Sequence, residues 1–166
     1  SARKKGMEGF HSMKGTTASL HRTFVALALA LLLTGCGSSV DSRLDEVRAL
    51  QDKGQFNESI EPLRSILAEA PELPEANHRL GVALVQTGQP SLAVWPLEKS
   101  ASSGEFAVTS GLLLASAFLS INAQDDAIRV ASHVLEVDPE RAAGLRIRAQ
   151  AQLAAGRKVE ALADAK

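Results

Sequence analysis

The sequence has 166 residues, of which 22% are charged and 4% aromatic, and its formal net charge is −1. This total hides two segments of opposite sign, because residues 1–36 carry five basic and one acidic side chain and the remainder carries 13 basic and 18 acidic ones. The acidic remainder lacks the basic stripe and stacking aromatic residues that hold nucleic acid, so we expect no nucleic-acid binding. The single cysteine excludes a disulfide within the chain.

An apolar run of ten residues, Phe24–Leu33, precedes the cysteine. Ten helical residues span about half of the roughly 30 Å hydrocarbon core of a bilayer, so the run is too short to be a transmembrane helix. Lys14 and Arg22 precede it and small residues follow it, which is the layout of an export signal. The alternative is a buried core helix, but the run lacks polar residues at helical spacing. Met13 is the natural start of such a signal, which places residues 1–12 upstream of it.

Leu33, Thr34, Gly35 and Cys36 follow one another at the end of this run. These four residues resemble the lipobox of bacterial lipoproteins, in which a leucine and two small residues precede a cysteine. The resemblance implies that residues 1–35 are removed as upstream sequence and signal peptide, and that Cys36 carries a diacylglyceryl group and an acylated amino terminus. A free buried thiol or half of an intermolecular disulfide are the alternatives, and neither accounts for the three residues before the cysteine.

Gly37 stands directly after the cysteine. In the lipoproteins that the sequence resembles, an aspartate at this position tends to retain the protein in the inner membrane. Glycine there therefore implies the outer membrane, facing the periplasm. Two or more acyl chains anchor a protein stably where one is marginal, so the lipid suffices as an anchor. We expect residues 36–43 to be the lipidated cysteine and a short tether, followed by the folded part in 44–166.

The folded part repeats itself with a period of 34 residues. Small residues at Gly81, Ala115 and Ala149 predict a close approach of two helices, while large apolar neighbours fill the adjoining gap. Gly or Asn at positions 54, 88, 122 and 156 suits the left-handed conformation that ends a helix. Each unit is thus predicted to be a helical hairpin.

Prolines mark the second helix of these hairpins. The residue before a proline avoids the helical region, so we expect second helices to stop before Pro71 and Pro139. Pro62 and Pro96 fall inside second helices, where we expect a kink or a shifted helix start.

A 34-residue helical hairpin with small residues at its eighth and twentieth positions and proline at its thirty-second resembles the tetratricopeptide repeat (TPR). The resemblance implies an all-α fold, a TPR solenoid of stacked hairpins forming a right-handed superhelix, because one hairpin cannot bury its apolar face alone. A helical bundle without repeat order is the alternative. The units are approximately 40–73, 74–107, 108–141 and an incomplete 142–166, which indicates a fragment of a longer protein.

By the same resemblance, partner segments bind in the concave surface lined by the first helix of each unit. Leu112 and Leu113 are either core or the apolar centre of this groove. Arg79 and Arg146 sit at groove positions two units apart and flank them, which favours a partner with a hydrophobic anchor between acidic ends. The predicted groove residues are His78, Arg79, Val82, Gln86, Leu112, Leu113, Ser116, Arg146 and Gln150.

Catalytic motifs are absent: no Ser/His/Asp order, no paired histidines at metal spacing and no phosphate-binding glycine loop occur. We therefore expect no enzyme activity, metal, small-molecule substrate or cofactor other than the lipid on Cys36. His78 is expected to be a surface or groove side chain, and Asp125 and Asp126 to favour the positive end of a helix. Trp95 is expected to pack within its helix pair.

These observations together predict a lipid-anchored TPR scaffold of the bacterial cell envelope that assembles or positions an envelope complex through protein contacts. The alternative is the substrate-recognition region of a larger enzyme whose catalytic domain lies beyond Lys166.

Overall fold

The computed structural model describes residues 39–164, all within one compact unit of the chain. Over that range the structure is all α-helical, as predicted, without a strand. The signal peptide, the lipobox and Cys36 lie outside the described residues. The helices are α2 (Val40–Asp52), α3 (Phe56–Glu69), α4 (Pro74–Gln86), α5 (Pro90–Ala101), α6 (Ala107–Ser120), α7 (Gln124–Val137), α8 (Ala142–Ala154) and α9 (Lys158–Asp164).

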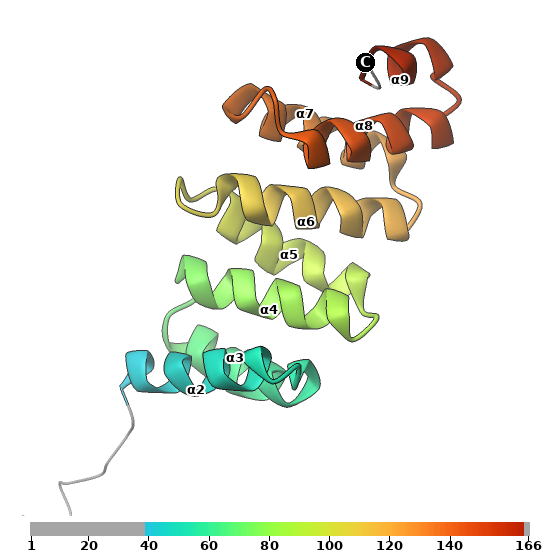
Figure 1. Cartoon of the computed structure of the whole chain (residues 1–166). Helices are drawn as coiled ribbons and strands as arrows, with labels where there is room; N and C mark the ends of the chain where they lie inside the picture. Colours follow the sequence, from blue (N-terminus) through green and yellow to red (C-terminus); the bar gives the residue numbers. More distant parts are fainter. Residues whose placement is uncertain (1–38, 165–166) are drawn as a thin grey trace, which may run out of the picture. The chain divides into compact units, whose positions relative to one another are not determined.

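Successive helices pair as hairpins, α2 with α3, α4 with α5, α6 with α7 and α8 with α9, and the hairpins stack along one direction (Figure 1). Each helix packs against the next one in the chain, and α4, α6 and α8 also contact one another in that order. The buried apolar residues form one core that runs from Leu44 to Ala151. No hairpin has a core of its own, which is the property that defines a solenoid.

Glycine or asparagine ends the first helix of every hairpin in the left-handed conformation, as predicted. The φ angles are +74° at Gly54, +76° at Gly88, +59° at Asn122 and +78° at Gly156. Asparagine is one of the few side chains that tolerates this region, so Asn122 replaces glycine without breaking the pattern.

Proline ends second helices where expected but does not shift them. The residues before Pro71 and Pro139 leave the helical region, with φ and ψ of −132° and 73° at Ala70 and −136° and 86° at Asp138. Pro62 and Pro96 lie inside α3 and α5, whose starts are unchanged six residues upstream. Of the two expected outcomes, a shifted start is not seen, and a kink at each proline stays a prediction.

The first helix starts earlier than expected. Residues 40–43, assigned to the tether, form the first turn of α2 instead. The Ser39 hydroxyl accepts a hydrogen bond from the Ser42 amide at 3.2 Å, which satisfies one of the free amides at the helix start. No helix in residues 39–164 is long and apolar enough to cross a membrane.

Small residues bring the paired helices together as the repeat pattern predicted. A Cβ atom on Gly81 would lie 2.3 Å from Cδ2 of Leu97, which is itself fully buried on α5. Ala115 is also fully buried at the same position of the next repeat, whereas Ala149 is only half-buried. The φ angle of Gly81 is one that any residue can adopt. The reason for glycine at position 81 is therefore the close approach of α4 to α5.

Trp95 does not pack within its helix pair, contrary to expectation. It is 54% exposed on α5, and the Lys99 ammonium lies 5.6 Å from the centre of its ring. The corresponding residues of the neighbouring repeats, Glu61 and Arg129, are charged, which shows that this position faces solvent throughout the array. The sequence pattern did not reveal this because tryptophan is usually buried.

Replacing Gly81 with alanine should lower the free energy of unfolding by about 1–3 kcal/mol, since the new methyl group overpacks against Leu97. Gly104→Ala is the matched control, because a Cβ atom there meets nothing within 4 Å. Chemical denaturation followed by circular dichroism measures both. Equal stability of the two variants would contradict the close approach of α4 and α5.

Candidate protein-binding groove

The predicted groove residues lie on three successive first helices, α4, α6 and α8, which contact one another in the stack. None of the nine side chains is buried. Gln86, Arg146 and Gln150 are exposed, and the remaining six are half-buried. This leaves a continuous surface of the first helices available to a partner.

Leu112 and Leu113 differ from Leu114 in their packing. Leu114 is only 2% exposed and belongs to the core. Leu112 and Leu113 are half-buried and pack against the edge of the core. The apolar run of α6 therefore supplies one core residue, Leu114, while Leu112 and Leu113 keep some exposed apolar surface beside the core.

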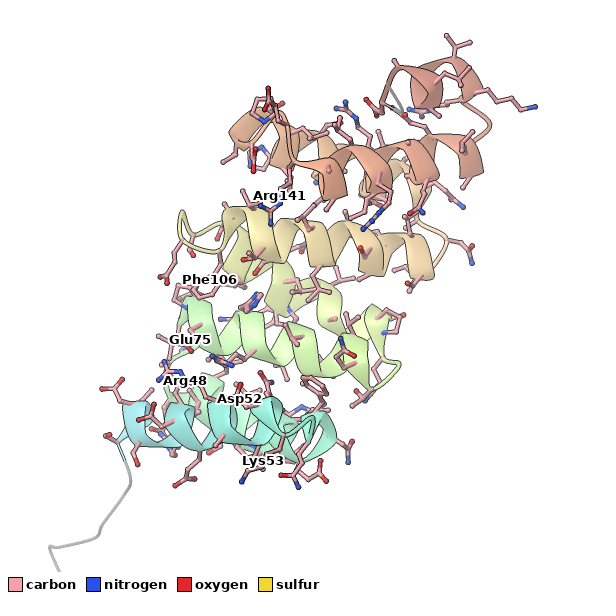
Figure 2. The ribbon with its side chains drawn as sticks, viewed as in Figure 1. Arg48, Asp52, Lys53, Glu75, Phe106 and Arg141 are labelled. Atoms are coloured by element: carbon pink, nitrogen blue, oxygen red, sulfur yellow. The ribbon has the colours of Figure 1, made fainter. Side chains whose placement is uncertain are left out.

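A hollow of about 540 Å³ lies at the end of this surface nearest the amino terminus. It brings together His78, Arg79 and Val82 of the predicted set with residues of α2, of the start of α3 and of the segment before α6. Figure 2 shows Asp52 of α2, Glu75 of α4 and Phe106 just before α6, which line it. The sequence also placed Glu75 at a groove position, and the lining residues that it did not predict are Gln51, Asp52, Phe56, Glu105 and Phe106.

These residues were missed for two different reasons. Gln51 and Asp52 belong to the repeat that matches the template least well, so groove positions were not transferred onto it. Glu105 and Phe106 precede α6 and therefore lie outside the helical positions of the template. Phe106, an aromatic residue just before a helix, was the one available signal.

His78 is held by a chain of hydrogen bonds that joins three helices. Ser100 Oγ donates to the carbonyl of Pro74 at 3.0 Å, and Ser110 Oγ donates to Ser100 Oγ at 2.9 Å. The Ser110 oxygen is then left to accept from His78 Nδ1 at 2.8 Å, so in this arrangement the proton is on Nδ1. The histidine ring also lies 5.0 Å from that of Phe106.

Burial lowers the pKa of His78 below its usual value, and the charge of Arg79 lowers it further. Both effects disfavour the charged imidazolium relative to the neutral ring. His78 presents its ring to the hollow as a half-buried surface.

Glu75 is the centre of an ion-pair cluster on the wall of the hollow. Its Oε1 accepts hydrogen bonds from Arg48 Nε and Arg79 Nε, each at 2.7 Å, and its Oε2 accepts from Arg48 Nη2. Gln51 adds two further bonds to Arg79, from its amide to the Arg79 carbonyl at 3.0 Å and from Arg79 Nη1 to its oxygen at 3.2 Å. The cluster joins α2 to α4, as Figure 2 shows for Arg48 and Glu75.

This cluster changes the expected role of Arg79. Its guanidinium is occupied by Glu75 and Gln51 and is not a free cation for a partner's acidic end. Asp52 and Glu105 line the same hollow, and neither makes an ion pair among the described residues. The hollow therefore favours a basic group at this end of the groove. Arg146 at the other end is exposed and makes no ion pair within residues 39–164.

The charged and polar groups of this surface are mostly bonded to one another. Within residues 39–164 no group of three or more His, Cys, Asp and Glu side chains is placed to hold a metal ion. The His78 imidazole is hydrogen-bonded to Ser110, which is in turn hydrogen-bonded to Ser100. The carboxylate of Glu75 is paired with two arginines. The surface offers apolar patches, carboxylates and one free arginine to a partner segment.

Glu75→Gln should destabilise the protein by about 1 kcal/mol at pH 7, a modest value because the ion pairs are partly exposed. Arg48 holds the pKa of Glu75 at about 2, well below its usual value of 4.5, and Arg79 assists. A lowered folded-state pKa gives stability that is full above pH 4.5 and is lost as the pH falls towards 2. Urea unfolding at several pH values should show the gap between the two proteins closing over that window. A gap independent of pH would contradict the assignment.

Comparison with known proteins agrees with this architecture. A family model described as "Tetratricopeptide repeat" matches residues 44–105. A search of curated proteins by sequence finds no match.

Solved structures with a similar fold include several MamA proteins. MamA AMB-1 is 26% identical, with 89% of this chain and 88% of that chain covered and a TM-score of 0.71. MamA MSR-1 is 22% identical, with coverages of 89% and 84% and a TM-score of 0.70. MamA from Desulfovibrio magneticus RS-1 is 17% identical, with coverages of 92% and 93% and a TM-score of 0.71.

The family match, the 34-residue stacking of hairpins and the likeness to these structures point to the same fold. Residues 44–105 match the tetratricopeptide repeat, and the described helices form a solenoid of the same kind.

Proposed function

We propose that the protein is a lipid-anchored interaction scaffold of the bacterial cell envelope, which binds a segment of another protein along the first helices of its repeats. The observation that carries the binding role is the row of unburied first-helix side chains on α4, α6 and α8, with Leu112 and Leu113 at its centre. Half-buried leucines beside exposed polar residues are typical of surfaces that take a hydrophobic anchor.

The anchor rests on the sequence Leu33-Thr34-Gly35-Cys36 behind an apolar run and two basic residues. The lipid would hold α2 close to the bilayer, because only three residues separate Cys36 from Val40. The repeats would then face the periplasm from the outer membrane, where they would position components of an envelope complex.

Leu113→Ala should weaken capture of the partner by about 1–3 kcal/mol, since a half-buried leucine is a typical anchor contact. Arg146→Ala is the control and should cost about 1 kcal/mol or less, with an effect that fades in high salt. The partner is first isolated with the unaltered protein from a detergent extract of envelopes, and its affinity for each variant is then measured by calorimetry. Thermal unfolding of the same samples separates folding from binding. A destabilised Leu113→Ala protein with unchanged affinity per folded molecule would rule out the groove.

Cys36→Ser should abolish the anchor, because serine lacks the thiol that receives the diacylglyceryl group. We expect an uncleaved or mislocalised precursor and no incorporation of radiolabelled palmitate. A conservative change beyond the lipobox, Ser38→Ala, should leave both processing and labelling intact. A serine variant that runs at mature size and partitions with membranes would overturn the anchor while leaving the groove untouched.

A further inference from the structure

A second hollow lies away from the groove, between the second helices α5 and α7, and its volume is about 480 Å³. Its floor is formed by Leu114 of α6 and by Val130 and Val134 of α7. The first residue of α6, Ala107, and Gly111 one turn later complete the floor. None of these residues belongs to the predicted groove.

The hollow exists because this repeat has small residues where its neighbours have large ones. In the 34-residue register, Ala107 corresponds to Leu73 in the preceding repeat and to Arg141 in the following one. Gly111 corresponds to Asn77, which is fully buried, and to Leu145. A leucine at position 107 would extend into the space at the start of α6, whereas Val134 already fills the place of a side chain at Gly111. The space is therefore a property of the third repeat and does not follow from the fold.

The floor cannot close by a simple shift of helices. A Cβ atom on Gly111 would lie 2.6 Å from Cγ2 of Val134, so α6 and α7 are already in close contact beside the hollow. A volume in this range is typical of sites that take a small molecule or a few side chains of a peptide.

The rim of the hollow is polar and carries an excess of carboxylates. Glu98 of α5 lines it and makes no ion pair among the described residues. On α7, Glu136 Oε2 lies 3.1 Å from His133 Nδ1, and Arg129 is paired with Asp126 at 2.8 Å. The one arginine on the rim is thus neutralised, and the unpaired charge is negative.

We propose that this hollow binds a segment of a partner protein in which an apolar side chain adjoins a lysine or arginine. The apolar side chain would cover Leu114, Val130 and Val134, and the cation would meet Glu98 at the rim. Opposite charge at a rim sets specificity, while the apolar insertion supplies the affinity. This site is independent of the groove on the first helices, so one scaffold would hold two partners at once.

The test uses three acetylated hexapeptide amides with the central pairs Leu-Arg, Leu-Glu and Ala-Arg. Each is titrated into the isotope-labelled full chain in neutral detergent, and binding is followed by the amide shifts of Gly111 and Val134. The Leu-Arg peptide should bind at least five times more tightly than the other two. Shifts confined to Leu112 and Leu113, or equal binding of all three peptides, would overturn the proposal.

Ala107→Leu is the blocking variant, since leucine is the side chain of the preceding repeat at this position. It should weaken binding of the Leu-Arg peptide at least tenfold. Ala142→Leu is the matched control, because Ala142 is the exposed first residue of α8, and it should change binding less than twofold. Unchanged binding to Ala107→Leu would overturn the site.

Glu98→Arg is a second test that does not depend on the folding of Ala107→Leu, because it changes only the rim of the hollow. It should reverse the preference, so that the Leu-Glu peptide binds more tightly than Leu-Arg. An unchanged preference would overturn the role of the rim charge. A concentration-dependent dimer that Ala107→Leu abolishes would identify a second copy as the occupant and would also overturn the proposal.

Discussion

The structure depends on apolar helix faces that no single hairpin can cover by itself. Each pair of helices buries its face only when the next pair packs on it, and the core is therefore continuous from Leu44 to Ala151. Helices can pack this closely only where one of them has a small residue at the contact. Gly81 meets this requirement against Leu97, and the buried Ala115 occupies the same position one repeat later.

The apolar core is shared by all repeats, whereas each polar contact joins particular helices and sets the chemistry of the surface there. The chain of hydrogen bonds from His78 through Ser110 to Ser100 joins α4, α6 and α5 in the middle of the array. Glu75 and its two arginines tie α2 to α4. These groups are fixed by one another, so the surface that a partner meets there is already organised before binding.

The repeats use their two faces differently. The first helices offer half-buried apolar side chains along a continuous surface, centred on Leu112 and Leu113. The second helices are more charged, and the hollow beside α5 and α7 lies where the small side chain of Ala107 replaces the leucine of the preceding repeat. A solenoid allows such a change because each repeat contacts only its neighbours, so a repeat can acquire a site without disturbing the others.

Local rules were enough to predict the hairpins. The left-handed turn residues such as Asn122, the helix ends before Pro71 and Pro139, and the small residue at 81 each act over a few residues or within one 34-residue period. The 34-residue period also predicts that the hairpins stack. An apolar face that recurs in every unit can be buried only against the neighbouring units.

The sequence by itself therefore determined the all-α repeat architecture. Only the tertiary structure decided the state of individual side chains: Arg79 is occupied by Glu75, Trp95 is exposed, and Asp52 and Glu105 line one hollow. The physical reason is that these properties depend on contacts between different repeats. A periodic pattern records what the repeats share, whereas a binding surface is made by the positions at which they differ.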